Sequence, residues 1–219
     1  MVDLKQARSS MVEQQIRTWL VSDARILDLM ENLPRERFVP PAYRSLAYAD
    51  LSIPLGHGHV MEEPKIAARI LQALNVDSLD NVLEVGTGSG YLTACLAQLG
   101  RQVRSIDIHE AFIRAAALPL TDCGLNNIEL ECRDLGRGLP GVEQHYDAIV
   151  VTGSLPAYHE GFHRALTIGG RLLLIIGTEP VMEAVLFTRV DVDQWVRRSL
   201  FETCLPPLEN ATQPPAFTF

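Results

Sequence analysis

The chain has 219 residues, of which 47% are hydrophobic and 21% charged, a size and composition that suit one large core with modest additions. Its formal net charge is −8 and it has no cluster of lysine and arginine, which disfavours nucleic acid as a partner. No run of about 18 apolar residues and no apolar N-terminal stretch occurs, so we expect neither a membrane span nor a secretory signal. The four cysteines lack C-x-x-C spacing, which favours reduced thiols in a cytoplasmic protein.

The N-terminal third has the apolar spacing of helices. Helices are predicted over 11–20 and 22–33, the second opened by a serine–aspartate pair and ended by a proline. Prolines and glycines over 47–58 indicate a loop or a short strand, and a further helix begins at Pro64. Residues 1–78 are therefore interpreted as a helical N-terminal extension.

From residue 79 onward, short apolar strands alternate with helices. This order predicts right-handed crossovers and an α/β domain with a doubly wound, mostly parallel sheet and helices on both faces. Strands are expected at 82–85, 103–108, 128–132, 146–151 and 171–176, and helices at 92–99, 111–123 and 159–166.

The remaining segments predict the edges of this domain. Pro119 is expected to end or kink its helix, and Gly169-Gly170 to form a turn. An antiparallel hairpin follows near the C-terminal end of the domain, which is taken as residues 79–205. The proline-rich stretch 206–219 is interpreted as an extended or irregular tail.

The most informative segment is LEVGTGSGY at 83–91, where a strand runs into a glycine-rich turn and then a helix. Glycines let the backbone turn tightly and approach a ligand, and ligands of such sheets bind beyond the carboxyl ends of the strands. Gly86, Gly88 and Gly90 form G-x-G-x-G with Glu84 two residues ahead, a pattern unlike that of a dinucleotide site.

Two further acids follow the next two strands. Asp107 lies 107 − 86 = 21 residues past Gly86, where a carboxylate accepts hydrogen bonds from both ribose hydroxyls. Asp134 follows the third strand, where it can accept from an adenine amino group. Packing glycines and a helix-capping Asp107 are the structural alternatives, but the ordered set indicates a ligand that contains adenosine.

Several motifs together resemble one family, the protein-L-isoaspartate O-methyltransferases, over residues 11–207. The matching segments are PRERFVP at 34–40, AYAD at 47–50, PLGHG at 54–58, LEVGTGSGY at 83–91, YDAIVVT at 146–152 and GGRL at 169–172.

This resemblance implies a class I methyltransferase of Rossmann-like fold with S-adenosylmethionine as cofactor and S-adenosylhomocysteine as product. It implies transfer of a methyl group to the carboxylate of isoaspartyl residues in damaged proteins or peptides, with an acceptor-side loop within 1–78. The cofactor residues that it implies are His59, Val60, Glu84, Gly86, Thr87, Gly88, Ser89, Gly90, Asp107, Ile108, Asp134 and Leu135.

The chain departs from the family pattern at the acceptor side. The family's T-I-S-[QA]-P reads VMEEP at 60–64, with Glu62 at the serine position, and its V-P-L is blurred to LPPL at 205–208. Glu62 is therefore the candidate catalytic residue. An ionised Glu62 would repel an acceptor carboxylate by roughly 3 kcal/mol at about 5 Å, which predicts weak isoaspartyl methylation near pH 7 and a gain for Glu62→Ser.

Other readings of Glu62 stay open. It can be protonated in a buried pocket and donate a hydrogen bond, point away, act as a base or anchor for a neutral or cationic acceptor, or be a solvated surface residue. The alternatives to isoaspartyl methylation are a same-fold methyltransferase with another small acceptor and a cofactor-binding protein without catalysis. The oligomeric state is not indicated.

Histidines give weak signals. His57 and His59 with Glu62 resemble part of a metal cluster, but no fourth ligand is obvious and no metal is expected. His159 and His163 lie four residues apart on an expected helix and are interpreted as surface residues.

Overall fold

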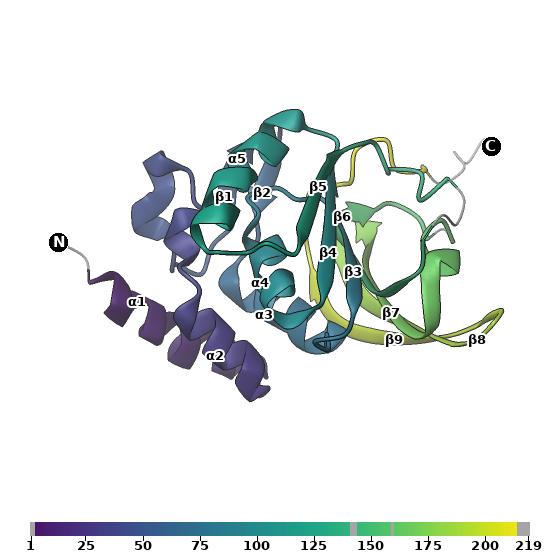
Figure 1. The fold of residues 1–219 in the computed structure, drawn as a ribbon, viewed down its shortest axis with the longest axis horizontal. Helices are drawn as coiled ribbons and strands as arrows, with labels where there is room; N and C mark the ends of the chain where they lie inside the picture. The colour runs from purple at the N-terminus through teal and green to yellow at the C-terminus, as the bar shows by residue number, and fades with distance from the viewer. Residues whose placement is uncertain (1–2, 141–143, 159, 214–219) are drawn as a thin grey trace.

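The computed structural model describes residues 3–140, 144–158 and 160–213. Its centre is a seven-stranded sheet in the order β5-β4-β3-β6-β7-β8-β9 (Figure 1). Strands β3 to β7 are parallel, and β8 and β9 add an antiparallel hairpin at one edge. The chain winds outward from β3 in both directions, so the predicted doubly wound sheet and edge hairpin are confirmed. The strands are β3 Asn81–Val85, β4 Gln102–Asp107, β5 Ile128–Cys132, β6 Tyr146–Leu155, β7 Leu166–Thr178, β8 Val181–Asp191 and β9 Gln194–Thr203.

Three long helices cover one face of the sheet: α3 Pro64–Leu74, α4 Tyr91–Leu99 and α5 Glu110–Asp122. Their apolar side chains and those of the strands form one continuous core. A second core lies on the opposite face, where the described cover consists of loops, the C-terminal segment and the 3-10 turn His163–Ala165. The helical cover is therefore unequal between the two faces. None of the described helices is long and apolar enough to cross a bilayer.

The N-terminal extension packs against α3 and shares its core. Helix α1 Leu4–Met11 continues into irregular helical turns that end at Leu20, which has a left-handed φ of 62°. Helix α2 spans Ala24–Asn32, and the Asp23 side chain caps it by accepting from the Arg25 N–H at 2.9 Å. The two expected helices are thus present, the first starting earlier than predicted. A short β-hairpin, β1 Ile53–Gly56 and β2 His59–Met61, follows the extension.

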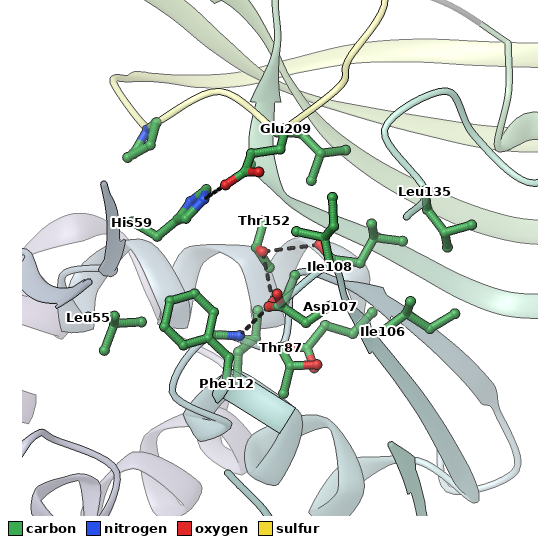
Figure 2. Close-up of a pocket in the computed structure, with 18 of the residues that line it drawn as sticks. Leu55, His59, Thr87, Ile106, Asp107, Ile108, Phe112, Leu135, Thr152 and Glu209 are labelled. Carbon is green, nitrogen blue, oxygen red and sulfur yellow. Dashed lines mark hydrogen bonds and ion pairs between the residues drawn. The ribbon is translucent and has the colours of Figure 1, made fainter. Parts of the chain in front are cut away.

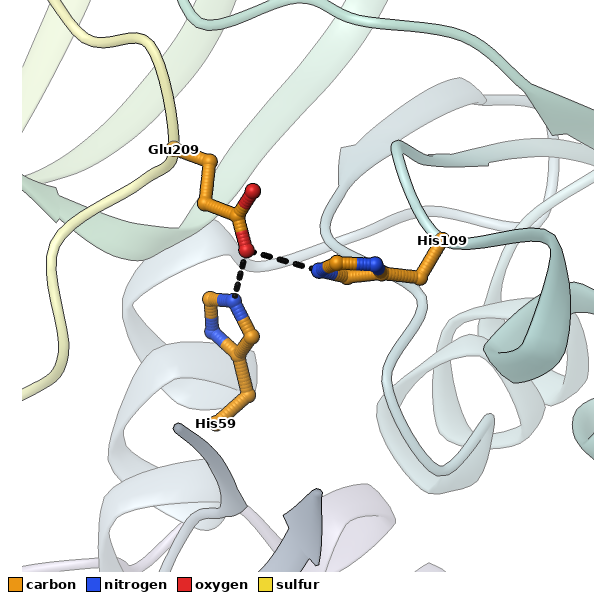
Figure 3. A group of neighbouring side chains, drawn as sticks. All are labelled: His59, His109 and Glu209. Atoms are coloured by element: carbon orange, nitrogen blue, oxygen red, sulfur yellow. Dashed lines mark hydrogen bonds and ion pairs between the residues drawn. The ribbon is translucent and has the colours of Figure 1, made fainter. Parts of the chain in front are cut away.

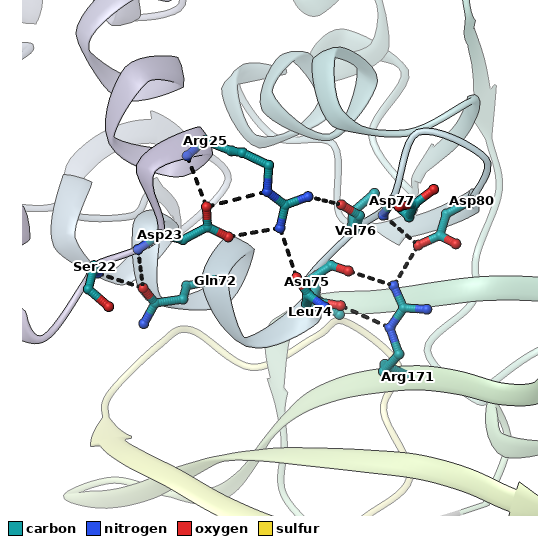
Figure 4. Close-up of polar contacts among 10 residues, drawn as sticks. All are labelled: Ser22, Asp23, Arg25, Gln72, Leu74, Asn75, Val76, Asp77, Asp80 and Arg171. Atoms are coloured by element: carbon teal, nitrogen blue, oxygen red, sulfur yellow. Dashed lines mark hydrogen bonds and ion pairs between the residues drawn. The ribbon is translucent and has the colours of Figure 1, made fainter.

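Polar contacts fix the extension to the sheet around the end of α3 (Figure 4). The Gln72 side-chain oxygen accepts from two backbone N–H groups at the start of α2, at 2.7 and 3.0 Å. The Arg25 guanidinium donates to the Val76 carbonyl at 3.0 Å, and that of Arg171 in β7 donates to the Leu74 carbonyl at 2.9 Å. Helix α3 is therefore anchored at its C-terminal end to both α2 and the sheet.

Pro119 does not end its helix, since α5 continues to Asp122; the other expected outcome, a kink at Pro119, stays a prediction. Two local expectations were wrong. Gly169-Gly170 do not form a turn between elements but a bulge within β7, where Gly169 has a φ of 84°. The helix expected at 159–166 is reduced to the turn His163–Ala165, because Leu166 already pairs with β6; His159 lies outside the described residues.

The C-terminal segment packs along β6. The Ser154 N–H donates to the Pro206 carbonyl at 3.0 Å, the Leu208 N–H donates to the Ser154 carbonyl at 2.8 Å, and Ala211 is buried in the second core. Residues 206–213 are irregular, as expected, but they are held on the sheet. Residues 214–219 lie outside the described residues, and the predicted division at residues 78 and 205 stays a prediction.

Candidate active site

A cleft opens at the carboxyl ends of β3, β4 and β6, between the β1–β2 hairpin and the C-terminal segment (Figure 2). It encloses about 810 Å³, part of which is open to solvent. The sequence-predicted residues that line it are His59, Val60, Glu62, Glu84, Gly86, Thr87, Gly88, Ser89, Asp107, Ile108, Asp134 and Leu135. Among the candidate cofactor residues, only Gly90 does not line the cleft.

The glycine turn presents bare backbone to the cleft. Gly86 has a φ of 100°, and a Cβ there would lie 2.1 Å from Oγ1 of Thr152. The Thr152 hydroxyl is within hydrogen-bond reach of the Val85 and Gly86 carbonyls at 3.1 and 2.9 Å, so the turn is fastened from β6. Gly88 also has a left-handed φ, of 50°. Gly90 has a packing role instead, because a Cβ there would lie 2.7 Å from that of Ala116 in α5.

Glu84 is fully buried at the floor of the cleft. Its Oε2 accepts from the hydroxyls of Thr93 at 2.5 Å and Ser105 at 2.6 Å, while its Oε1 has no partner among the described residues. Burial raises the pKa of Glu84 to about 8; the two hydroxyls oppose this shift, and the carboxylates of Glu62 and Asp107 add to it. One oxygen of this buried carboxyl is thus left for a ligand.

The two other predicted acids sit where the sequence places them, at the ends of β4 and β5, but both already accept backbone hydrogen bonds. Asp107 accepts from the N–H groups of Gly88 at 3.0 Å and His109 at 2.8 Å, so it also fastens the start of α5. Asp134 accepts from the Gly136 N–H at 2.9 Å and from the Asn210 side-chain amide at 2.8 Å. A carboxylate has about four acceptor sites, so each can still accept from a ligand.

Glu62 lies in the cleft, directly before α3. Glu62 is half-buried, and burial raises its pKa; its own backbone N–H and the charge of Arg35 oppose this shift. Its place in the lining of the cleft disfavours the interpretation of Glu62 as a solvated surface residue. A carboxyl in this position can stay protonated and donate a hydrogen bond.

A buried arginine positions the Glu62 loop. Arg35, only 1% exposed, donates to the backbone carbonyl of Glu62 and to that of Ala47 at 2.9 Å, and its guanidinium lies 4.8 Å from the centre of the Tyr91 ring. Burial lowers the pKa of Arg35. Arg35 thus links the loop that carries Glu62 to Ala47 and to Tyr91 of α4.

The sequence reasoning missed part of the cleft. The additional lining residues are Leu55, Met61, Val85, Leu92, Ile106, Phe112, Arg133, Gly136, Thr152, Gly153, Leu205, Pro206, Leu208 and Glu209. Several belong to motifs already singled out, such as Thr152, the last residue of YDAIVVT at 146–152. Glu209 carried no local signal, because only the folded C-terminal segment brings it to the cleft.

The histidines also differ from expectation. His163 is buried, not on the surface, and its Nε2 lies 3.1 Å from the hydroxyl oxygen of Tyr158. His57, His59 and Glu62, which in the sequence weakly resemble part of a metal cluster, are not grouped as one in the structure. His59 faces His109 and Glu209 instead.

Comparisons with known proteins agree with the motifs. A family model of protein-L-isoaspartate(D-aspartate) O-methyltransferase matches residues 6–212. Protein-L-isoaspartate O-methyltransferase 1 of Rhodopseudomonas palustris (strain HaA2) is 37% identical over 202 residues, covering 92% of this chain and 82% of the relative. Protein-L-isoaspartate O-methyltransferase of Anaeromyxobacter dehalogenans (strain 2CP-C) is 39% identical over 171 residues, covering 76% of this chain and 81% of the relative.

Solved structures give the same fold. A structure from Plasmodium falciparum, described as a protein-L-isoaspartate O-methyltransferase in complex with S-adenosyl-L-homocysteine, superposes with a TM-score of 0.79 at 19% identity and covers 92% of this chain and 98% of that one. Another structure of a protein-L-isoaspartate O-methyltransferase has a TM-score of 0.77 at 25% identity and covers 91% of this chain and 65% of that one.

The fold, the cleft and these matches define an S-adenosylmethionine-dependent methyltransferase with a doubly wound sheet. The chain belongs to the protein-L-isoaspartate(D-aspartate) O-methyltransferase family.

Proposed function

We propose that this chain transfers a methyl group from S-adenosylmethionine to the side-chain carboxylate of isoaspartyl residues in proteins or peptides. The observation that carries the proposal is the cleft itself, which brings the glycine turn, Glu84, Asp107 and Asp134 together beside Glu62. Each of these residues offers a group that suits one part of the cofactor or of the acceptor.

The residues present fit the cofactor. The partnerless Oε1 of Glu84 is a buried acceptor that suits the ammonium group of the methionine part once the carboxyl has released its proton. Gly88 gives backbone access without a side chain, since a Cβ there would point to within 3.3 Å of the Leu55 side chain. Asp107 and Asp134 retain acceptor sites for ribose hydroxyls and an adenine amino group.

When bound, S-adenosylmethionine supplies a methyl group activated by its sulfonium sulfur, which an acceptor carboxylate oxygen takes in an in-line displacement that leaves S-adenosylhomocysteine. Because a carboxylate is already nucleophilic, the work left to this chain is alignment and exclusion of water. The anchored Glu62 loop and the C-terminal segment on β6 form the two sides of the cleft that hold the acceptor in line.

Glu62 is proposed to act as a protonated hydrogen-bond donor to the acceptor carboxylate. Its raised pKa favours the neutral carboxyl, which removes the repulsion of roughly 3 kcal/mol that an ionised Glu62 would impose. A neutral carboxyl can then do what the serine hydroxyl does in the family pattern. We therefore expect isoaspartyl methylation by the unmodified chain, in contrast to the expectation for an ionised Glu62.

A second candidate function rests on the same residue. An acceptor without a negative charge would tolerate either protonation state of Glu62, so a same-fold methyltransferase acting on a small neutral or cationic molecule is the alternative. Parallel assays with labelled S-adenosylmethionine separate the two, one with an isoaspartyl peptide, one with its aspartyl counterpart and one with a panel of small metabolites. A cytoplasmic location, expected from the reduced cysteines, stays a prediction.

A further inference from the structure

We propose that His59, His109 and Glu209 form a binding site for a divalent transition-metal ion of the zinc type at the rim of the cleft. The three residues come from β2, from the turn between β4 and α5, and from the C-terminal segment (Figure 3). They are separated by 50 and 100 positions in the sequence, so only the fold brings them together. This proposal is independent of the identity of the methyl acceptor.

The geometry of the three ligand atoms is close to that of a metal site. Nε2 of His59 lies 2.9 Å from Oε1 of Glu209, and Nε2 of His109 lies 2.7 Å from the same oxygen. All three ligand atoms lie within 4.8 Å of one another. In a tetrahedral zinc site, bonds of about 2.0–2.2 Å separate the ligand atoms by roughly 3.3 Å, so small side-chain shifts are enough to admit the ion.

The surroundings of the trio fix its imidazole rings. The His57 ring stacks on that of His109 at 4.2 Å between ring centres, and the Phe112 ring meets the His109 ring edge-on at 5.2 Å. In the part of the chain that the structure describes, no lysine or arginine forms an ion pair with Glu209.

The chemistry of the set selects the class of ion. Two imidazole nitrogens and one carboxylate oxygen suit zinc and its first-row neighbours, whereas calcium and magnesium prefer oxygen ligands throughout. The side chains of His59, His109 and Glu209 are 23%, 18% and 40% exposed, so an ion can reach them from solvent. With three protein ligands, a fourth position remains for water or another small ligand.

Such an ion would tie the C-terminal segment to the β1–β2 hairpin. His59 of the hairpin and Glu209 of the C-terminal segment both line the cleft, and their side chains meet at 2.9 Å (Figure 2). An ion would replace the two hydrogen bonds to Oε1 of Glu209 with coordinate bonds to the same three side chains. Metal binding should therefore hold the C-terminal segment against the β1–β2 hairpin and raise the thermal midpoint of the full chain.

The test is equilibrium dialysis of the full chain against zinc, with bound metal measured by elemental analysis, together with the visible spectrum of the cobalt-substituted chain. The background is Cys132→Ser with Cys204→Ser, because both thiols are exposed. The variants are His59→Gln, His109→Gln and Glu209→Gln, and the matched control is His145→Gln, an exposed histidine that does not line the cleft. Circular dichroism checks that each variant is folded.

We expect one bound zinc per chain, unchanged by His145→Gln and by excess magnesium. Removing a residue that only hydrogen-bonds to a metal ligand weakens metal binding by about 10–100-fold in other proteins. Each substitution of a ligand itself should therefore weaken zinc binding at least about tenfold. The cobalt form should show d–d bands without a thiolate charge-transfer band. If an imidazole variant does not fold, Glu209→Gln decides, since it lies on the irregular C-terminal segment. The proposal would be overturned if the chain with His59, His109 and Glu209 intact bound no zinc. It would also be overturned if zinc binding were unchanged in each of the three variants.

Discussion

The backbone N–H of Gly88 donates a hydrogen bond of 3.0 Å to Oδ2 of Asp107. This contact joins the glycine turn after β3 to the end of β4, the two points that the sequence assigns to different parts of the same ligand. The other oxygen of Asp107 accepts from the His109 N–H at the start of α5. Asp107 therefore both shapes the cleft and offers its remaining acceptor sites to the cofactor.

Replacing Asp107 tests this double role. Asp107→Ala should weaken binding of S-adenosylmethionine by about 1.5–3 kcal/mol, the scale of a lost charge-assisted hydrogen bond. Asp107→Asn should weaken cofactor binding less than Asp107→Ala does, because its amide oxygen can still accept from one backbone N–H. Isothermal titration calorimetry measures both. Binding unchanged in Asp107→Ala would show that the carboxylate does not face the cofactor.

A modified cofactor separates the ribose contact from the structural one. A 2′-deoxy analogue should lose affinity against the unmodified chain but much less against Asp107→Ala, because the partner of the 2′-hydroxyl is already gone. Equal losses in the two proteins would remove Asp107 from the ribose.

Gly88→Val should abolish detectable cofactor binding while leaving the fold largely intact. The valine would adopt a φ of 50° and place its side chain towards Leu55, in the space that the ligand needs. Gly124→Val is the matched control: it has a φ of 73°, no atoms near its Cβ position and no place in the cleft lining. Calorimetry and thermal denaturation together distinguish lost binding from lost folding. Equal binding by both variants would contradict the assignment of the turn.

Glu84 should make stability fall as pH rises. Its pKa is about 8 when folded, against about 4.5 when unfolded, so between these values the folded chain holds a proton that the unfolded chain releases. Relative to Glu84→Gln, the unmodified chain should therefore lose stability from about pH 4.5 to about pH 8, by up to about 5 kcal/mol. Urea denaturation at several pH values measures this difference. The exposed Glu202→Gln is the control, and a pH-independent difference for Glu84→Gln would be the contrary result.

Most of the fold could be predicted from the sequence, because it depends on local signals. The alternation of apolar strands and helices, and the glycine turn after Glu84, are set by neighbouring residues. For the same reason the acids after successive strands, Asp107 and Asp134, could be placed at one edge of the sheet. Their hydrogen bonds to backbone N–H groups could not, since these depend on how each loop closes.

The parts that the sequence did not reveal depend on long-range packing. Glu209 lies in a segment without periodicity, and only its path along β6 brings it to His59 and His109. His163 carries a side chain common on surfaces, yet the aromatic rings of Tyr158 and Phe187 enclose it. The raised pKa of Glu62 likewise results from burial, which no local pattern encodes.

Methylation of isoaspartyl peptide should fall as pH rises through the pKa of Glu62, which burial places above its usual value. The protonated carboxyl donates a hydrogen bond to the acceptor, and its ionisation would replace that bond with repulsion. Glu62→Ser and Glu62→Gln should both flatten the profile, because neither side chain ionises. The neighbouring Glu63→Gln should keep the profile of the unmodified chain, since Glu63 pairs with Lys65 outside the cleft. A profile unchanged by Glu62→Ser would show that Glu62 does not face the acceptor.

The most direct test of the proposed activity is the initial rate of labelled methyl transfer from S-adenosylmethionine to an isoaspartyl peptide and to its aspartyl counterpart, measured below the pH at which Glu62 ionises. We predict base-labile methyl ester on the isoaspartyl peptide and none above background on the aspartyl one, with calorimetry on the same preparation showing that the cofactor binds. A preparation that binds the cofactor but esterifies neither peptide, with or without Glu62→Ser, would contradict the account.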